Sequence, residues 1–347
     1  MSAPLSIGPN PSRPALFYAK AGALYVSDPA GSPGRKLTNG PADTEPAPSP
    51  DGAHLAYAHK AKASDEGSEV WVLDLSPQGE VIGTPRRLVG KDELPAPVEM
   101  RPRKFTSPRW SPTGERVAFL ELEEGGGLLF VADAQTGAVP RSQPLLFAKS
   151  YAWAPDGKHI AWVGGRSDVS PVAVNVFTVG ARSSPVANDT NAFAVAYGHD
   201  GQSVLFANGD ASGMAAAEPR FAIDQGGIYS VATPDGVPAD PPPTPQPLVT
   251  GQAYYGDVAA LASGAVAFTT ADATNRSKKL QLLKDPSAPS STTIGDVATD
   301  PPGPAWGPGD VVAFLDTSPG RRLVVLGPQG SAPKQVDTEV DSFAWPS

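Results

Sequence analysis

The sequence predicts an all-β protein that forms a single β-propeller, and three observations support this fold. Pro and Gly account for 40 and 36 of the 347 residues, and both residues disfavour the interior of a helix. A short motif recurs along the chain at a spacing typical of a four-stranded propeller blade. After each motif, apolar residues alternate with a period of two, as they do in half-buried strands.

The recurring motif is a tight turn that ends in glycine, and the better copies have an aromatic residue before the turn. Examples are Trp110–Gly114 and Trp153–Gly157, each of which precedes an apolar segment. Pro-Asp-Gly favours a tight turn between two strands. The turn glycines are Gly52, Gly114, Gly157, Gly201, Gly264 and Gly309, with gaps of 62, 43, 44, 63 and 45 residues. The shorter gaps define the repeat, and the two longer ones indicate insertions.

Each motif is followed by a second alternating segment and then by a shorter one, which gives four strands in each repeat. Four strands in a repeat make one propeller blade. The expected blades span approximately residues 43-90, 105-148, 149-188, 192-250, 254-295 and 301-338.

The two ends of the chain complement each other. Residues 342-347 match a repeat that stops before its turn, and residues 14-40 supply the strands that should follow that turn. We therefore expect 342-347 to form the innermost strand of the N-terminal blade, which closes the ring and removes exposed sheet edges. This predicts seven four-stranded blades in one domain over 1-347. Six blades are the alternative, because the copy near Ala260 is degenerate.

The motif copies resemble the PD40 (WD40-like) repeat of TolB-like β-propellers. The best matches are Trp153–Trp162, Trp110–Phe119 and Ser49–Tyr57, and the resemblance extends over essentially the whole chain. Proteins of this kind include periplasmic adaptors, surface proteins and gating domains of prolyl-oligopeptidase-like enzymes. The resemblance thus implies an extracytoplasmic protein of a bacterial cell envelope. The start of the chain, Met1–Pro4, lacks the pattern of a signal sequence, so a cytoplasmic location stays open.

Charge and composition exclude several classes of function. The net charge is −9, which disfavours nucleic acid as a partner. The absence of Cys removes disulfides, thiolate metal sites and a Cys nucleophile. No apolar run approaches the ~20 residues that span a bilayer. The sequence also contains no Gly-x-Ser-x-Gly, phosphate-binding loop or His-Glu-x-x-His motif. We therefore expect a non-catalytic binding or scaffold protein, and a monomer.

The expected binding surface is the mouth of the central channel where most insertions gather. These insertions are His59–Ser68, Gly90–Lys104, Gly164–Pro171, Asn208–Gly226 and Thr270–Lys279, whereas the Pro-rich loop Pro234–Pro245 belongs to the opposite face. Insertions crowded on one face of a repeat array often mark its binding face. Residues a few positions before each motif should line this mouth: Asp43, Glu45, Phe105, Ser107, Lys149, Phe193, Tyr255, Asp257 and Asp341. Mixed carboxylates and aromatic rings suit a polar or cationic partner. We expect that partner to be a protein or peptide.

Two further possibilities arise from the acidic and polar residues. Asn208, Asp210 and Ser212 follow a spacing similar to a calcium loop, but Glu218 falls one position early for an EF-hand, and we expect no other cofactor. Asp43, Glu45, Asp257 and Asp341 leave open a glycosidase or lyase that works with paired carboxylates at the channel. Besides a binding protein and an enzyme, the third possible function is that of a structural component of a surface layer.

Overall fold

A computed structural model describes residues 15–27, 34–90, 92–94, 102–123, 126–140, 146–165, 172–181, 183–187, 192–208, 226–271, 278–288, 290–298, 302–327 and 332–346. It confirms the all-β prediction, since one short 3-10 turn, η1 (Pro234–Gly236), is the sole helical element within these ranges. No described helix has the length and apolar character needed to cross a membrane.

The strands form five four-stranded antiparallel sheets and one seven-stranded sheet. Sheet by sheet, the strands are β27 (Ser342–Ala344), β1 (Leu16–Lys20), β2 (Ala23–Ser27) and β3 (Arg35–Lys36); β4 (Ala42–Pro48), β5 (His54–Lys60), β6 (Glu69–Leu75) and β7 (Val81–Val89); β8 (Phe105–Trp110), β9 (Arg116–Glu123), β10 (Gly126–Asp133), β11 (Phe147–Trp153), β12 (His159–Gly165), β13 (Ala173–Thr178) and β14 (Ser183–Ala187); β15 (Ala192–Tyr197), β16 (Ser203–Asn208), β17 (Gly226–Ala232) and β18 (Gln246–Gly251); β19 (Tyr254–Ala260), β20 (Val266–Ala271), β21 (Lys278–Leu283) and β22 (Thr292–Val297); and β23 (Ala305–Gly307), β24 (Val311–Leu315), β25 (Leu323–Leu326) and β26 (Lys334–Asp337).

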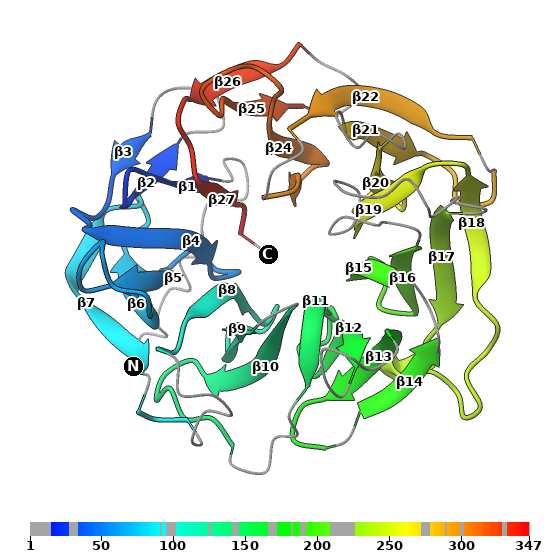
Figure 1. Ribbon diagram of the computed structural model, residues 1–347, viewed down its shortest axis with the longest axis horizontal. Coiled ribbons are helices and arrows are strands. Elements are labelled where there is room, and N and C mark those ends of the chain that lie inside the picture. The colour runs from blue at the N-terminus through cyan, green and yellow to red at the C-terminus, as the bar shows by residue number, and fades with distance from the viewer. Residues whose placement is uncertain are drawn as a thin grey trace, which may run out of the picture.

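The sheets follow one another around a common axis, which is the arrangement of a β-propeller (Figure 1). Strands β27, β4, β8, β11, β15 and β19 lie nearest the centre, and we call them, together with β23, the inner strands. Strands β7, β14, β18, β22 and β26 lie at the rim. Each inner strand except β27, the last strand of the chain, enters a tight turn at its far end. All six predicted turn glycines have positive φ, between 65° at Gly157 and 84° at Gly264, which glycine adopts at little cost.

The seven-stranded sheet joins two of the expected repeats. Phe147 and Ala148, at the start of β11, pair with Leu128 and Gly127 of β10 on one side. The same two residues pair with β12 on the other side. The segment therefore ends one repeat and begins the next, so the predicted boundary between 148 and 149 falls inside a strand.

The two ends of the chain pair as predicted. Strand β27 lies antiparallel to β1, and Phe17, Tyr18 and Ala19 face Ala344, Phe343 and Ser342. Side chains link this sheet to the neighbouring one, since the Tyr18 hydroxyl donates a hydrogen bond to Asp337, the last residue of β26, at 2.7 Å. Burial opposes ionisation of Asp337, but hydrogen bonds from Lys20 and Tyr18 outweigh it and lower the pKa of this carboxyl.

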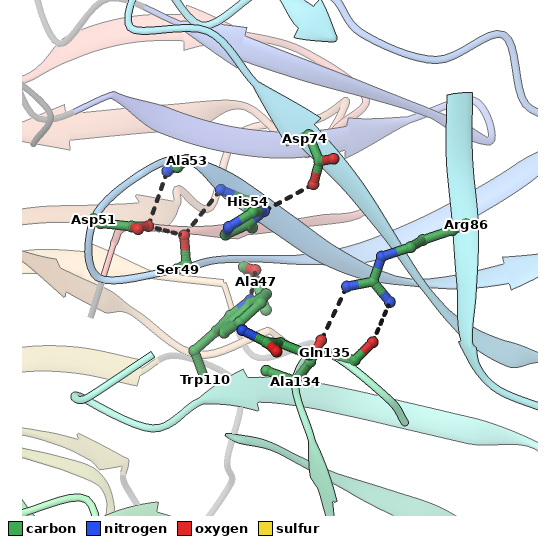
Figure 2. Close-up of polar contacts among 10 residues, drawn as sticks. All are labelled: Ala47, Ser49, Asp51, Ala53, His54, Asp74, Arg86, Trp110, Ala134 and Gln135. Atoms are coloured by element: carbon green, nitrogen blue, oxygen red, sulfur yellow. Dashed lines mark hydrogen bonds and ion pairs between the residues drawn. The ribbon is translucent and has the colours of Figure 1, made fainter. Parts of the chain in front are cut away.

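In two copies of the motif, the aromatic residue hydrogen-bonds to the inner strand of the preceding repeat. Figure 2 shows Trp110 with its Nε1 donating to the Ala47 carbonyl at 2.8 Å, and the His54 ring stacks on Trp110 with ring centroids 5.7 Å apart. Trp153 repeats the contact, donating from Nε1 to the Arg109 carbonyl at 3.2 Å. Apolar clusters span neighbouring sheets in the same way. Trp110 and Trp153 thus help to hold successive repeats together.

Candidate functional site at the start of the inner strands

A β-bulge interrupts five of the inner strands near their first residues. The register shifts lie between Thr44 and Ala47, Thr106 and Arg109, Ala148 and Ser150, Ala192 and Ala194, and Gly256 and Ala259. Five predicted binding residues occupy these bulges, and we call them the bulge residues: Glu45, Ser107, Lys149, Phe193 and Asp257. A bulge re-aims a side chain out of the regular alternation of a strand and is common next to functional sites.

Three of the bulge residues have a left-handed backbone conformation. The φ angles are 53° at Glu45, 52° at Ser107 and 45° at Asp257. Such values are uncommon for residues other than glycine and carry a cost in conformational energy. Because the same strain recurs at one position of three repeats, it points to a shared structural or binding role.

The bulge residues lie at the end of the sheets where the second and third strands connect. The first residues of inner strands pair with the last residues of second strands, as Ala42 does with Lys60 and Ala192 with Asn208. Tyr254 and Ala271 form the same pair in another sheet. This end of the sheets, called here the channel-mouth end, is opposite to the tight turns, as the sequence predicted.

Glu45 connects three successive inner strands. Its carboxylate accepts hydrogen bonds from the Thr106 hydroxyl at 2.6 and 2.8 Å and from the Ser107 backbone N–H. Its own N–H donates to the Ser342 hydroxyl of β27 at 2.9 Å. These contacts give hydrogen-bond partners to the backbone N–H groups of Glu45 and Ser107, both of which have positive φ. Glu45 therefore links β27, β4 and β8 at the channel-mouth end.

Ser107 extends this chain of contacts to the next inner strand. Its carbonyl accepts a hydrogen bond from the Tyr151 hydroxyl, which also lies 3.0 Å from the Ala118 carbonyl. The Arg109 guanidinium donates to the Tyr151 carbonyl at 2.8 Å and lies 5.1 Å from the centre of its ring. Burial raises the pKa of the Tyr151 phenol, so the hydroxyl stays protonated and acts as a donor.

Lys149, Phe193, Asp257 and Asp341 carry the side chains that a partner can reach. Lys149 is exposed, and its Nζ lies 5.8 Å from the ring centre of half-buried Phe193, a cation–π contact. Asp257 is half-buried, accepts a hydrogen bond from Thr269 at 2.8 Å and lies 3.8 Å from the Lys278 ammonium. Asp341 is exposed.

The other three predicted binding residues are buried in the core. Asp43 is 2% exposed, Phe105 0% and Tyr255 5%. The Phe105 ring packs against Phe119, with 5.1 Å between centroids, and Tyr255 packs against Phe268 at 5.7 Å. These residues therefore support the channel-mouth end from within and do not present their side chains to a partner.

The sequence analysis missed His59, which pairs with Asp43. The two residues face each other across β4 and β5, and His59 Nδ1 lies 2.6 Å from a carboxylate oxygen of Asp43. Their side chains are 16% and 3% exposed, and the Trp71 ring lies over the imidazole with centroids 4.4 Å apart. Counting the hairpin register back from the turn, with one bulge included, would have found this pair.

The predicted calcium site lies mostly outside the described residues. Asn208 is half-buried at the end of β16, and Asp210 and Ser212 follow it beyond the described range. Among the residues that the structure describes, no three His, Asp or Glu side chains are grouped to hold a metal ion.

Comparisons of sequence find no matching family model and no matching curated protein. Comparison of structure finds TolB and other propeller proteins. TolB from Acinetobacter baumannii aligns with a TM-score of 0.57 at 16% identity, over 85% of this chain and 66% of that chain. The chain therefore spans about two thirds of the length of that TolB.

Other propeller proteins align over most of the chain. The β-propeller domain of the trilobed protease from Pyrococcus furiosus, described as having an open velcro topology, gives a TM-score of 0.54 at 15% identity over 91% of this chain and 87% of that one. An oligogalacturonate lyase in complex with manganese gives 0.57 at 12% identity, over 94% and 84%. These likenesses establish the propeller fold.

Proposed function

We propose that this chain is a seven-bladed propeller, closed by β27, that binds a protein or peptide partner at its channel-mouth end. The observation that carries the proposal is the recurrence of a bulge at the start of successive inner strands. It turns polar, charged and aromatic side chains away from the regular strand pattern at one end of the molecule. In keeping with the TolB-like resemblance, we propose an extracytoplasmic location in a bacterial cell envelope.

The exposed part of this surface indicates the chemistry of the partner. Lys149 and Phe193 offer a cation beside an aromatic face, whereas Asp257 on β19 and Asp341, the residue before β27, offer carboxylates. A peptide carrying both charges and an apolar anchor suits such a surface, because charged groups set orientation and an apolar anchor supplies most of the affinity. Glu45 and Ser107 would keep the backbone beneath it in place.

Site-specific photo-crosslinking tests the proposal with a control in the same hairpin. Lys149 and Lys158 are both exposed, but Lys149 lies at the start of β11 and Lys158 lies in the turn between β11 and β12. A photoreactive residue at 149 is expected to capture a discrete partner from envelope extract, and the same residue at 158 is not. Equal capture at both positions, or capture at 158 alone, would place the binding surface elsewhere.

An enzyme at the same end is the second candidate. It is favoured by the structural likeness to oligogalacturonate lyase and by the buried Asp43, which orients His59 as acid–base sites require. Against it, Glu45 and Asp257 bind different neighbouring hydroxyl groups and form no carboxylate pair in the described contacts. Ultraviolet-absorbing products formed from oligogalacturonate, with or without added manganese, and lost in His59→Gln, would support it.

A further inference from the structure

The connection between β17 and β18 is a rigid, proline-rich loop on the face opposite the bulge residues. Proline occupies positions 241, 242, 243, 245 and 247. The loop begins at the turn end of the sheets, because the Thr233 N–H donates to the carbonyl of Gln202, which lies in the turn before β16, at 2.8 Å. Gly236 also lies close to His159, at the start of β12: a side-chain Cβ at position 236 would be 2.5 Å from His159 Nδ1. Figure 1 shows this connection at the rim of the ring.

The sequence of the loop favours an extended, polyproline II-like backbone. Each proline fixes its own φ near −65°, and each residue before a proline is held in the extended region. Every residue of Pro241–Pro247 is either a proline or the residue before a proline. Within the continuously described range 226–271, Pro238–Pro245 makes one hydrogen bond, from the Gln246 side chain to the Thr244 carbonyl at 3.0 Å. Absence of internal hydrogen bonds is typical of polyproline II.

One face of such a helix is exposed to solvent. Pro241, Thr244, Gln246 and Pro247 are exposed, and Pro242, Pro243 and Pro245 are half-buried. Polyproline II has three residues per turn, so Pro241, Thr244 and Pro247 share one face. This face presents two proline rings to solvent on either side of a small polar residue.

Both ends of the loop are fixed to the sheet. The Tyr197 hydroxyl donates to the Gly236 carbonyl at 2.9 Å, and Val237 packs against the apolar cluster formed by the neighbouring sheets. At the other end Pro247 pairs with Tyr229 in the ladder between β17 and β18. A segment held in its binding conformation loses little entropy on association. The loop is therefore suited to act as a ligand.

We propose that Pro241–Pro247 is a docking ligand for a partner domain with an aromatic-lined groove that recognises polyproline II. Grooves of SH3, WW and EVH1 domains bind such segments because the extended helix is already formed. The charged residues of 226–251 are Asp235 and Asp240, both exposed and acidic. The partner should therefore carry Arg or Lys beside its aromatic groove, which pairs with Asp240 and orients the segment.

The test measures binding of the full chain to a panel of purified SH3, WW and EVH1 domains, chosen to include basic residues beside the groove. We expect a basic-flanked domain to bind, and Pro241→Ala/Pro247→Ala to lose about tenfold or more in affinity, as removal of an apolar anchor does. Asp240→Lys should also weaken binding. Pro185→Ala, at an exposed proline of the rim strand β14, is the matched control and should bind as the wild type does.

Two results would overturn the proposal. One is that no domain of the panel binds the folded protein at millimolar concentration, and the other is that the double proline variant binds as well as Pro185→Ala. Circular dichroism and thermal unfolding of all variants confirm that the exposed substitutions leave the fold intact. The outcome is independent of the channel-mouth proposal, because the two surfaces lie on opposite faces.

Discussion

His59→Ala is expected to destabilise the protein by about 3–5 kcal/mol, the cost of leaving a buried carboxylate without its partner. The Asp43 carboxylate is 3% exposed, and its side-chain partner in the described structure is His59, at 2.6 Å. Removing the imidazole takes away the side-chain partner of this carboxylate among the described residues. It also opens a gap beside Trp71, which packs on the imidazole ring.

Chemical denaturation of two further variants separates this effect from a general loss of packing. His54→Ala is the matched control, because His54 lies on the same strand and pairs with Asp74 at 2.8 Å while the two side chains are 40% and 52% exposed. Exposed pairs contribute about 0.2–1 kcal/mol. Asp43→Asn combined with His59→Ala should recover part of the loss, since the buried charge is gone. Equal losses for His54→Ala and His59→Ala would refute the assignment.

A disulfide between residues 19 and 342 is expected to form and to stabilise the protein by about 2–4 kcal/mol. Ala19 and Ser342 are register partners across β1 and β27, and both are small enough to replace with Cys. The chain contains no Cys, so in Ala19→Cys/Ser342→Cys the two new thiols are the only ones that can form a disulfide within the chain. The link joins nearly the whole chain into one loop, which restricts the unfolded state.

The measurement is mass spectrometry after mild oxidation, followed by denaturation with and without reductant. Ser342→Cys alone serves as the reference, because it already removes the hydrogen bond from the Glu45 N–H to the Ser342 hydroxyl. A variant that stays reduced, or that links two chains to each other, would contradict closure of the ring by β27.

The sequence predicts the strands and turns well because their signals are local. Each Asp-Gly or related turn needs a positive φ, and each of the six turn glycines has one. The boundary near residue 148 is different, because Phe147 and Ala148 pair with β10 and β12 at once. A segment that pairs with strands on both sides needs no turn residue and no change in its apolar pattern. The sequence therefore carries no signal that two repeats share Phe147 and Ala148.

The sequence located the channel-mouth end but did not show which of its residues are buried, and the bulges explain why. In a regular strand Asp43 and Glu45 would share a face, as alternate residues do. The bulge between Thr44 and Ala47 disrupts that alternation, and Asp43 is buried whereas Glu45 is half-buried. Spacing from the motif locates the bulge, but burial on either side of it depends on packing against the next sheet. Phe105 and Tyr255 were misplaced for the same reason.

Binding of a partner at the channel-mouth end is tested most directly by the affinity of the captured partner. Calorimetry would compare the wild type, Lys149→Ala/Phe193→Ala and Lys158→Ala. We predict that the double variant, which removes the cation and the ring it contacts, weakens binding by about tenfold or more, whereas Lys158→Ala binds as the wild type does. Unchanged affinity of the double variant, or a loss confined to Lys158→Ala, would contradict the claim.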